Sequence, residues 1–225
     1  MLQLAKFKHF DDDIFKKYQK EANDYYKYRG QELNWCRHWE YPWVLKYGQF
    51  SKNDTVLDAG GGYNYFPCIL SSRVKEVVVL DKNPISLNHC VSFTPRFICQ
   101  NLEDLCLTEQ FDKVISISVI EHIDKWEEAI KKLIKCVKVK GLLILTINVD
   151  LNNKRPIFYS QISKILSIFN KQSIKLIGHT DIDINDEFTK EKCIENNIIL
   201  PDLDKVRIGE ERYTIIGIIA QKEYE

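Results

Sequence analysis

The sequence has no excess of charge of either sign. Lysine plus arginine and aspartate plus glutamate both total 32, so the formal net charge is zero and the isoelectric point is near 6.9. Proteins that bind nucleic acid usually carry a positive excess, because they neutralise backbone phosphates. The composition therefore argues against a nucleic-acid partner for the chain as a whole.

Long apolar runs and closely paired cysteines are also missing, and a secretory leader is not expected. No apolar run approaches the roughly 18 residues that a membrane span requires. Residues 1–13 lack the apolar core of a signal peptide and end in three aspartates. The 7 cysteines form no C-x-x-C pair, and several lie in apolar segments where a reduced thiol packs as a small hydrophobe. We therefore expect a reducing, cytoplasmic compartment and no membrane partner.

The chain is long and apolar enough for a large folded unit, with 225 residues of which 44% are hydrophobic. From residue 55 onward, short β-rich runs alternate with helix-like segments, which predicts an α/β fold with mostly parallel strands and helices on both faces. A helix over residues 125–138 is expected to end at Gly141. We predict a seven-stranded, Rossmann-like sheet built from residues 55–58, 77–80, 97–100, 113–118, 142–148, 174–177 and 213–221.

Residues 1–50 are polar but rich in aromatic residues, whose spacing is closer to helical than to alternating. We expect two or three helices here, with a break at Pro42. One interpretation is a helical cap of residues 1–50 that packs on a domain of residues 51–225. A second interpretation is a lid over a ligand site formed by residues 35–43, in which Trp39 and Tyr41 contact the ligand. Both interpretations can hold for different residues.

Residues 55–64, T-V-L-D-A-G-G-G-Y-N, have the pattern of a buried strand that runs into a glycine-rich turn. Ligands of open α/β sheets bind outside the carboxyl ends of the strands, and glycine lets the backbone come close to them. A dinucleotide fingerprint, G-x-G-x-x-G, would need a glycine at position 65, which is Tyr65. This departure weakens an NAD or FAD assignment.

The run V-L-D-A-G-G-G at residues 56–62 resembles the first motif of the class I S-adenosylmethionine-dependent methyltransferases of the small-molecule, type 11 kind. Asn64 replaces a third glycine found in many members, and asparagine tolerates a left-handed backbone better than most residues. The resemblance implies that the cofactor is held by Asp58, Gly60, Gly61 and Gly62.

The resemblance continues at the next two strand ends and covers residues 53–150. Asp81 lies 23 residues after Asp58, where the family's acid accepts hydrogen bonds from two ribose hydroxyls, and Lys82 follows it. Asn101 and Leu102 lie where the family contacts adenine, although aspartate is more usual than asparagine at the first position.

Residues 111–114 and 118–123, F-D-K-V and S-V-I-E-H-I, are similar to the family's fourth motif. The resemblance implies that Ser118 faces the methionine end of the cofactor, and either Arg37 or Arg29 is a candidate for pairing with its carboxylate. His122 is a candidate general base, because imidazole titrates near neutral pH. Its alternative role is that of a packed, hydrogen-bonded histidine.

Some relatives carry an E-x-x-E-H run that binds a divalent ion. Ser118 replaces the first acid of that run, so we predict no catalytic metal. Asp181, Asp183 and Asn185 imitate the start of a calcium loop, but Asp186 stands in place of the required glycine, so calcium binding is not expected.

The resemblance implies an enzyme that moves a methyl group from S-adenosylmethionine to a small molecule. We favour oxygen over nitrogen as the acceptor atom and a sugar or an aromatic compound as the acceptor, with Tyr159 as a further contact. The alternatives are a non-catalytic cofactor-binding sensor or assembly protein, and aminopropyl transfer, for which the acids of residues 181–187 are the only candidates. The sequence leaves the acceptor and the oligomeric state open.

Overall fold

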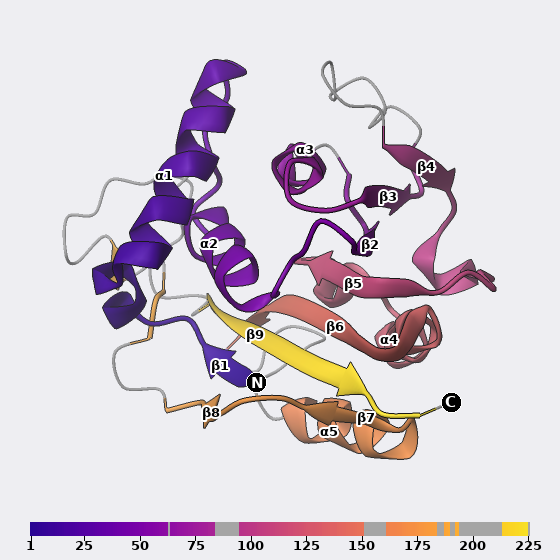
Figure 1. The fold of residues 1–225 in the computed structure, drawn as a ribbon. Helices are drawn as coiled ribbons and strands as arrows, with labels where there is room; N and C mark the ends of the chain where they lie inside the picture. Colours follow the sequence, from indigo (N-terminus) through magenta and orange to yellow (C-terminus); the bar gives the residue numbers. More distant parts are fainter. Residues whose placement is uncertain are drawn as a thin grey trace.

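The structure is a computed structural model that describes residues 1–62, 64–83, 95–150, 161–183, 187–189, 192–193 and 213–224. The described strands form one nine-stranded sheet in the order β4-β3-β2-β5-β6-β9-β1-β8, with β7 also paired to β9 (Figure 1). The strands are β1 (Leu2–Leu4), β2 (Thr55–Ala59), β3 (Glu76–Asp81), β4 (Arg96–Cys99), β5 (Phe111–Ile117), β6 (Val137–Asp150), β7 (Ile174–Leu176), β8 (Thr180–Asp181) and β9 (Tyr213–Lys222).

The predicted α/β class and the mostly parallel centre of the sheet are confirmed. Strands β4, β3, β2, β5 and β6 pair in parallel, and β9 runs antiparallel to β6. All seven predicted strands are present, but the predicted strand count is too low. The two additional strands, β1 and β8, are only three and two residues long, too short to give a sequence pattern of period two.

Helices cover both faces of the sheet (Figure 1). Side chains of α1, α2 and α3 pack in one apolar cluster, and those of α4 and α5 pack in the other. The α-helices are α1 (Asp13–Tyr28), α2 (Arg37–Tyr47), α3 (Phe66–Ser71), α4 (Trp126–Lys135) and α5 (Ile162–Lys171), and the 3-10 turns are η1 (Phe7–Asp11), η3 (Leu102–Asp104) and η4 (Ile120–His122). None of the described helices has both the length and the apolar content to cross a bilayer.

The central strands are continuous apolar runs because they are covered on both sides. In β2, Val56 belongs to the cluster under α1 to α3, while Leu57 belongs to the cluster under α4 and α5. In β3, residues Val77 to Leu80 alternate between the same two clusters and are all buried. This double cover fixes the register of the strands whose carboxyl ends carry the candidate site.

The amino-terminal 50 residues contribute two helices and the strand β1. Leu2–Leu4 pairs with β9 in the main sheet, so this segment is joined to the rest by backbone hydrogen bonds. The division at residue 50 remains a prediction. The expected break at Pro42 is wrong, because α2 continues through it. Proline removes one helical hydrogen bond, but Trp39, Tyr41 and Trp43 are all fully buried, and this packing outweighs that loss.

The expected end of α4 at Gly141 is also wrong. The helix ends at Lys135, and Gly141 lies inside β6. A Cβ at this glycine would lie 2.8 Å from the carbonyl oxygen of Asp112 on the neighbouring strand. Gly141 is therefore suited to the close approach of two strands and not to a helix end.

Candidate functional site

The glycine turn follows β2 at the carboxyl edge of the sheet. Gly60 has a φ of +80°, and a Cβ there would lie 2.4 Å from a methyl group of Val119, so no larger residue fits without movement. Gly62 also has a positive φ, of +46°. Asn64 is not in the left-handed region; instead, its side chain donates to the carbonyl of Gly61 and accepts from the amide of Phe66, at 2.5 and 2.9 Å. Asn64 therefore stabilises the turn through its side chain.

Asp81 ends β3 directly beside this turn. Its two carboxylate oxygens accept from the backbone amides of Gly62, at 2.8 Å, and Asn83, at 2.9 Å. Each oxygen keeps a further lone pair, because a carboxylate can accept about four hydrogen bonds. The carboxylate is thus oriented by backbone donors and can still accept from the hydroxyls of a ligand.

A cleft of about 140 Å³ lies along these strand ends. It brings together five of the residues that the sequence predicts for the cofactor. Its lining consists of Gly60, Leu80, Asp81, Lys82, Gln100, Asn101, Leu102, Val119, His122 and Ile123. Asn101 donates through Nδ2 towards the acids Glu103 and Asp104, at 3.3 and 3.4 Å, which leaves its carbonyl oxygen as the group suited to an amino donor.

Asp58 is buried at the base of the turn and is only 2% exposed. Its Oδ2 atom has no hydrogen-bond partner within the described part of the chain. Burial raises the pKa of Asp58 to about 7, opposed by the positive charge of Arg37 and assisted by the nearby Asp81. The carboxyl group therefore titrates near neutrality beside the cleft.

A second cavity, of about 280 Å³, adjoins the first, because His122 lines both. It combines aromatic, charged and amide side chains. Its lining consists of Asn34, Trp35, Cys36, Arg37, Ser118, Glu121, His122, Asn148 and Tyr213. The structure thus places two of the predicted cofactor contacts, Arg37 and Ser118, in the second cavity and not in the first.

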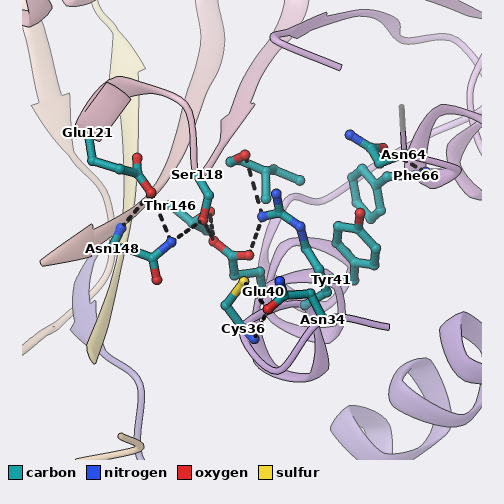
Figure 2. A network of polar contacts seen from close by, with 12 residues as sticks. Asn34, Cys36, Glu40, Tyr41, Asn64, Phe66, Ser118, Glu121, Thr146 and Asn148 are labelled. Carbon is teal, nitrogen blue, oxygen red and sulfur yellow. Dashed lines mark hydrogen bonds and ion pairs between the residues drawn. The ribbon is translucent and has the colours of Figure 1, made fainter. Parts of the chain in front are cut away.

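A buried polar network centred on Glu40 (Figure 2) includes two residues that line the second cavity, Arg37 and Ser118. Glu40 is fully buried. One carboxylate oxygen accepts from the hydroxyls of Ser118 and Thr146, at 2.5 and 2.6 Å, and the other forms an ion pair with Arg37. Burial alone lowers the pKa of Arg37, but the charge of Glu40 outweighs it and raises that pKa well above its usual range. Arg37 is therefore a permanently charged group that faces the cavity.

The same network constrains the chain after β5. Ser118 has a φ of +50°, a left-handed conformation that is uncommon outside glycine. Its hydroxyl donates to Glu40 and accepts from the side-chain amide of Asn148, at 2.7 Å. These bonds hold a strained residue at the mouth of the cavity.

Glu121 follows three residues later and faces Asn148 on β6. Its Oε1 atom accepts from both the backbone and the side-chain nitrogen of Asn148, at 3.0 and 2.9 Å. Its Oε2 atom is buried without a partner among the described residues. Burial raises the pKa of Glu121 to about 7, and Glu40 adds to the shift.

The predicted acceptor contacts Trp39 and Tyr41 do not line either cavity. Both side chains are fully buried, with the Trp39 indole donating to His9 and the Tyr41 hydroxyl bonded to Tyr26. They belong to the packing of the N-terminal helices, and Trp35 is the aromatic residue of this segment that reaches the cavity. The periodicity of the rings does not reveal which face of α2 meets the cavity.

Three other predictions concern Tyr159, the acids of residues 181–187 and a metal site. Tyr159 lies outside the described residues. Asp181, one of the acids of residues 181–187 considered for aminopropyl transfer, forms ion pairs with Lys6 and Lys8, at 2.6 and 3.1 Å. Within the described ranges, no group of three or more His, Cys, Asp or Glu side chains is placed to bind a metal.

The sheet order, the glycine turn and the acid at the end of the second parallel strand define the class I methyltransferase fold. Residues 57–145 match the family model described as Methyltransferase domain. This similarity covers less than half of the chain, and the fold is the one that the sequence motifs predict.

A named relative is similar to part of this chain. The ubiquinone biosynthesis O-methyltransferase of Rickettsia bellii is 27% identical over 100 residues, which make up 41% of this chain and 42% of that protein. This chain thus matches less than half the length of that relative.

Two solved structures share the fold at low sequence identity. The N-methyltransferase NodS from Bradyrhizobium japonicum, solved with S-adenosylhomocysteine, is 12% identical with a TM-score of 0.58, over 95% of this chain and 100% of that one. The cyclase SpnF is 12% identical with a TM-score of 0.64, over 100% of this chain and 99% of that one.

Proposed function

We propose that the chain is an S-adenosylmethionine-dependent methyltransferase that acts on a small molecule. The observation that carries this proposal is the joint placement of Gly60, Asp81 and Asn101 around one cleft. A Cβ at Gly60 would clash, Asp81 is oriented to accept from hydroxyls, and Asn101 offers an amide oxygen. This set of groups suits a ribose that lies next to the glycine turn and Asp81, with an adenine next to Asn101.

When bound, S-adenosylmethionine supplies a methyl group that is already activated by the sulfonium charge. The protein therefore has to align the acceptor and exclude water, and proximity alone can contribute several orders of magnitude in rate. Arg37 is suited to a carboxylate because its guanidinium is charged and held by Glu40. The second cavity then holds the methionine end of the cofactor together with the acceptor.

We favour oxygen as the acceptor atom. The second cavity contains two buried oxygen acceptors without partners among the described residues, Glu121 Oε2 and Asn148 Oδ1, which suit a ligand that donates hydrogen bonds. An O-methyltransferase among the relatives points in the same direction. A neutral net charge favours a small acceptor over a nucleic acid. A cytoplasmic location remains a prediction.

The competing proposal is a protein that uses this fold without transferring a methyl group. SpnF, which is named as a cyclase, has the same fold, and fold alone does not determine the reaction. A sensor or assembly protein would bind the cofactor and show no turnover. Formation of S-adenosylhomocysteine with a panel of small acceptors separates these proposals.

The direct test is calorimetric titration with S-adenosylhomocysteine. We expect binding by the wild type and at least a tenfold loss of affinity in Asp81→Ala, because the hydroxyl acceptor is removed. Glu109→Ala is the matched control, since Glu109 pairs with Arg96 on the surface and lines neither cavity. Absence of binding by the wild type, or equal affinity in Asp81→Ala, would contradict the proposal.

A further inference from the structure

Glu121, which lines the second cavity, has one carboxylate oxygen that is hydrogen-bonded and one that has no partner among the described residues. We propose that Glu121 is the catalytic base of this site and that the acceptor is a phenol, whose hydroxyl proton passes to Glu121 Oε2. This inference rests on the proposed function, because it assigns the acceptor class and the proton transfer within the same site. It differs from the sequence-based expectation, in which His122 takes the proton.

The geometry around Glu121 distinguishes its two oxygens. Oε1 is fixed by two N–H groups of Asn148, at 2.9 and 3.0 Å, so the carboxylate cannot turn freely. Glu121 lines the second cavity, and its Oε2 atom is buried and has no donor among the described residues. A buried carboxylate oxygen without a donor is costly, so a ligand hydroxyl is the kind of group that satisfies it.

Other members of the network hold Glu121 in this position. Asn148 is itself fixed, because its side-chain nitrogen also donates to Ser118, which in turn is bonded to Glu40 (Figure 2). The left-handed backbone of Ser118 turns the chain immediately before the 3-10 turn that carries Glu121. A catalytic base needs this kind of fixed orientation towards the proton that it removes.

The acidity of the acceptor selects a phenol over a sugar. Burial sets the pKa of Glu121 at about 7. A phenolic hydroxyl such as that of tyrosine has a pKa of about 10, whereas that of water is about 15.7, and aliphatic hydroxyls resemble water. Proton transfer to Glu121 is therefore uphill by about three pKa units for a phenol, and by several units more for a sugar hydroxyl. The rings of Trp35 and Tyr213 in the cavity lining suit a planar acceptor.

The chemical step balances with these groups alone. The acceptor O–H bond breaks and its proton goes to Glu121 Oε2. The electron pair left on the acceptor oxygen forms the new O–C bond, and the electron pair of the broken S–C bond returns to sulfur. One carboxylate, one phenol and one sulfonium thus become one carboxylic acid, one methyl ether and one thioether.

The rate should depend on pH in a defined direction. Glu121 must be ionised to act, so the turnover rate should rise as pH rises through about 7 and then level off. The charged and titratable groups that face this site are Cys36, Arg37, Glu40, His122 and Tyr213. His122 is the only one of these with an ordinary pKa in the same range, so the experiment must separate it from Glu121.

The experiment measures S-adenosylhomocysteine formation from phenol, catechol, 4-hydroxybenzoate and 3,4-dihydroxybenzoate between pH 5.5 and 8.5, with methyl glucoside as a sugar probe. In Glu121→Gln the amide oxygen can still accept from Asn148, but it cannot take a proton. We expect Glu121→Gln to bind S-adenosylhomocysteine like the wild type, to lose about 10²–10⁴-fold in kcat and to lose the rise in rate near pH 7. His122→Gln should keep that rise, and Glu128→Gln, an exposed acid on α4, should match the wild type throughout.

Each result decides between the two proposals. A wild type that does not bind S-adenosylhomocysteine overturns the proposed function. Normal binding with no turnover of any phenol, or with faster turnover of the sugar probe, overturns the acceptor class and the base. Turnover that survives in Glu121→Gln, or a pH dependence that disappears only in His122→Gln, overturns the role of Glu121 and leaves methyl transfer intact.

Discussion

Replacement of Glu40 by alanine should strongly destabilise the protein. The carboxylate is fully buried. It forms an ion pair with Arg37 on its own helix and accepts hydrogen bonds from Ser118 and Thr146, which lie in two other segments. Removal of one partner of a buried ion pair leaves an uncompensated charge, which costs about 3–5 kcal/mol. Two hydroxyl donors also lose a charged acceptor, but they can rotate towards water or another oxygen. We expect a loss of about 3–5 kcal/mol in the free energy of unfolding.

Urea denaturation followed by circular dichroism measures this loss, with the slope m used to check that the unfolded state is unchanged. Glu40→Gln keeps the size and one oxygen, so its loss should be smaller, at about 1–3 kcal/mol. That variant also supplies a folded protein if Glu40→Ala does not accumulate. Glu109→Ala is the control, since its pair with Arg96 is nearly half exposed and should contribute at most about 1 kcal/mol.

The same variants separate stability from binding. Arg37 should move once Glu40 no longer holds it, so Glu40→Gln should also weaken binding of S-adenosylhomocysteine by about tenfold, or roughly 1.4 kcal/mol. A Glu40→Ala protein within 1 kcal/mol of the wild type would refute the reasoning, because it would show that the network does not support the cavity. Equal cofactor affinity in Glu40→Gln would show that Arg37 does not need its partner.

Three further predictions follow from the glycines and from Asp58. Gly60→Ala should abolish measurable binding of S-adenosylhomocysteine by calorimetry, since its Cβ would meet Val119 and its φ is +80°; binding within threefold of the wild type would contradict this. Gly217→Ala should lower the free energy of unfolding by about 1–3 kcal/mol, because its Cβ would lie 2.5 Å from the Trp43 ring; unchanged urea denaturation would contradict it. The pKa of Asp58 is raised to about 7, so its contribution to the free energy of unfolding is present below about pH 4 and is lost as pH rises to about 7. Asp58→Asn should therefore flatten the dependence of the free energy of unfolding on pH in that window. An unchanged pH dependence would show that this carboxyl is not the titrating group.

The residues that line the cleft at the glycine turn come together as expected, because their placement depends on local patterns. Buried parallel strands are recognisable as apolar runs, and parallel strands end at a common edge of the sheet. Asp81 and Asn101 are therefore expected near the glycine turn before any contact is known, and both line its cleft. The placement of Gly60 follows from the same logic, since only glycine suits its backbone and its neighbour Val119.

The second cavity is less predictable because its contacts join distant segments. Glu40 is bonded to residues 78 and 106 positions away, and no local pattern indicates those partners. The strongly aromatic segment around Trp39 likewise does not reveal which rings face the sheet and which face the cavity. The sequence offers one signal of this network. Glu40 follows Arg37 by three residues, which is the spacing of an ion pair on one face of a helix.

The strand β1 has a consequence for how the chain folds. Leu2–Leu4 pairs with Ile216–Ile218 of β9, which is the only described strand that joins β1 to β6. During synthesis Leu2–Leu4 emerge more than 200 residues before their partner in β9, so this pairing cannot form until β9 has left the ribosome. Contacts of such long sequence separation slow folding. Docking of β9 between β6 and β1 should therefore be a late step, and the apolar Leu2 and Leu4 remain uncovered until it occurs.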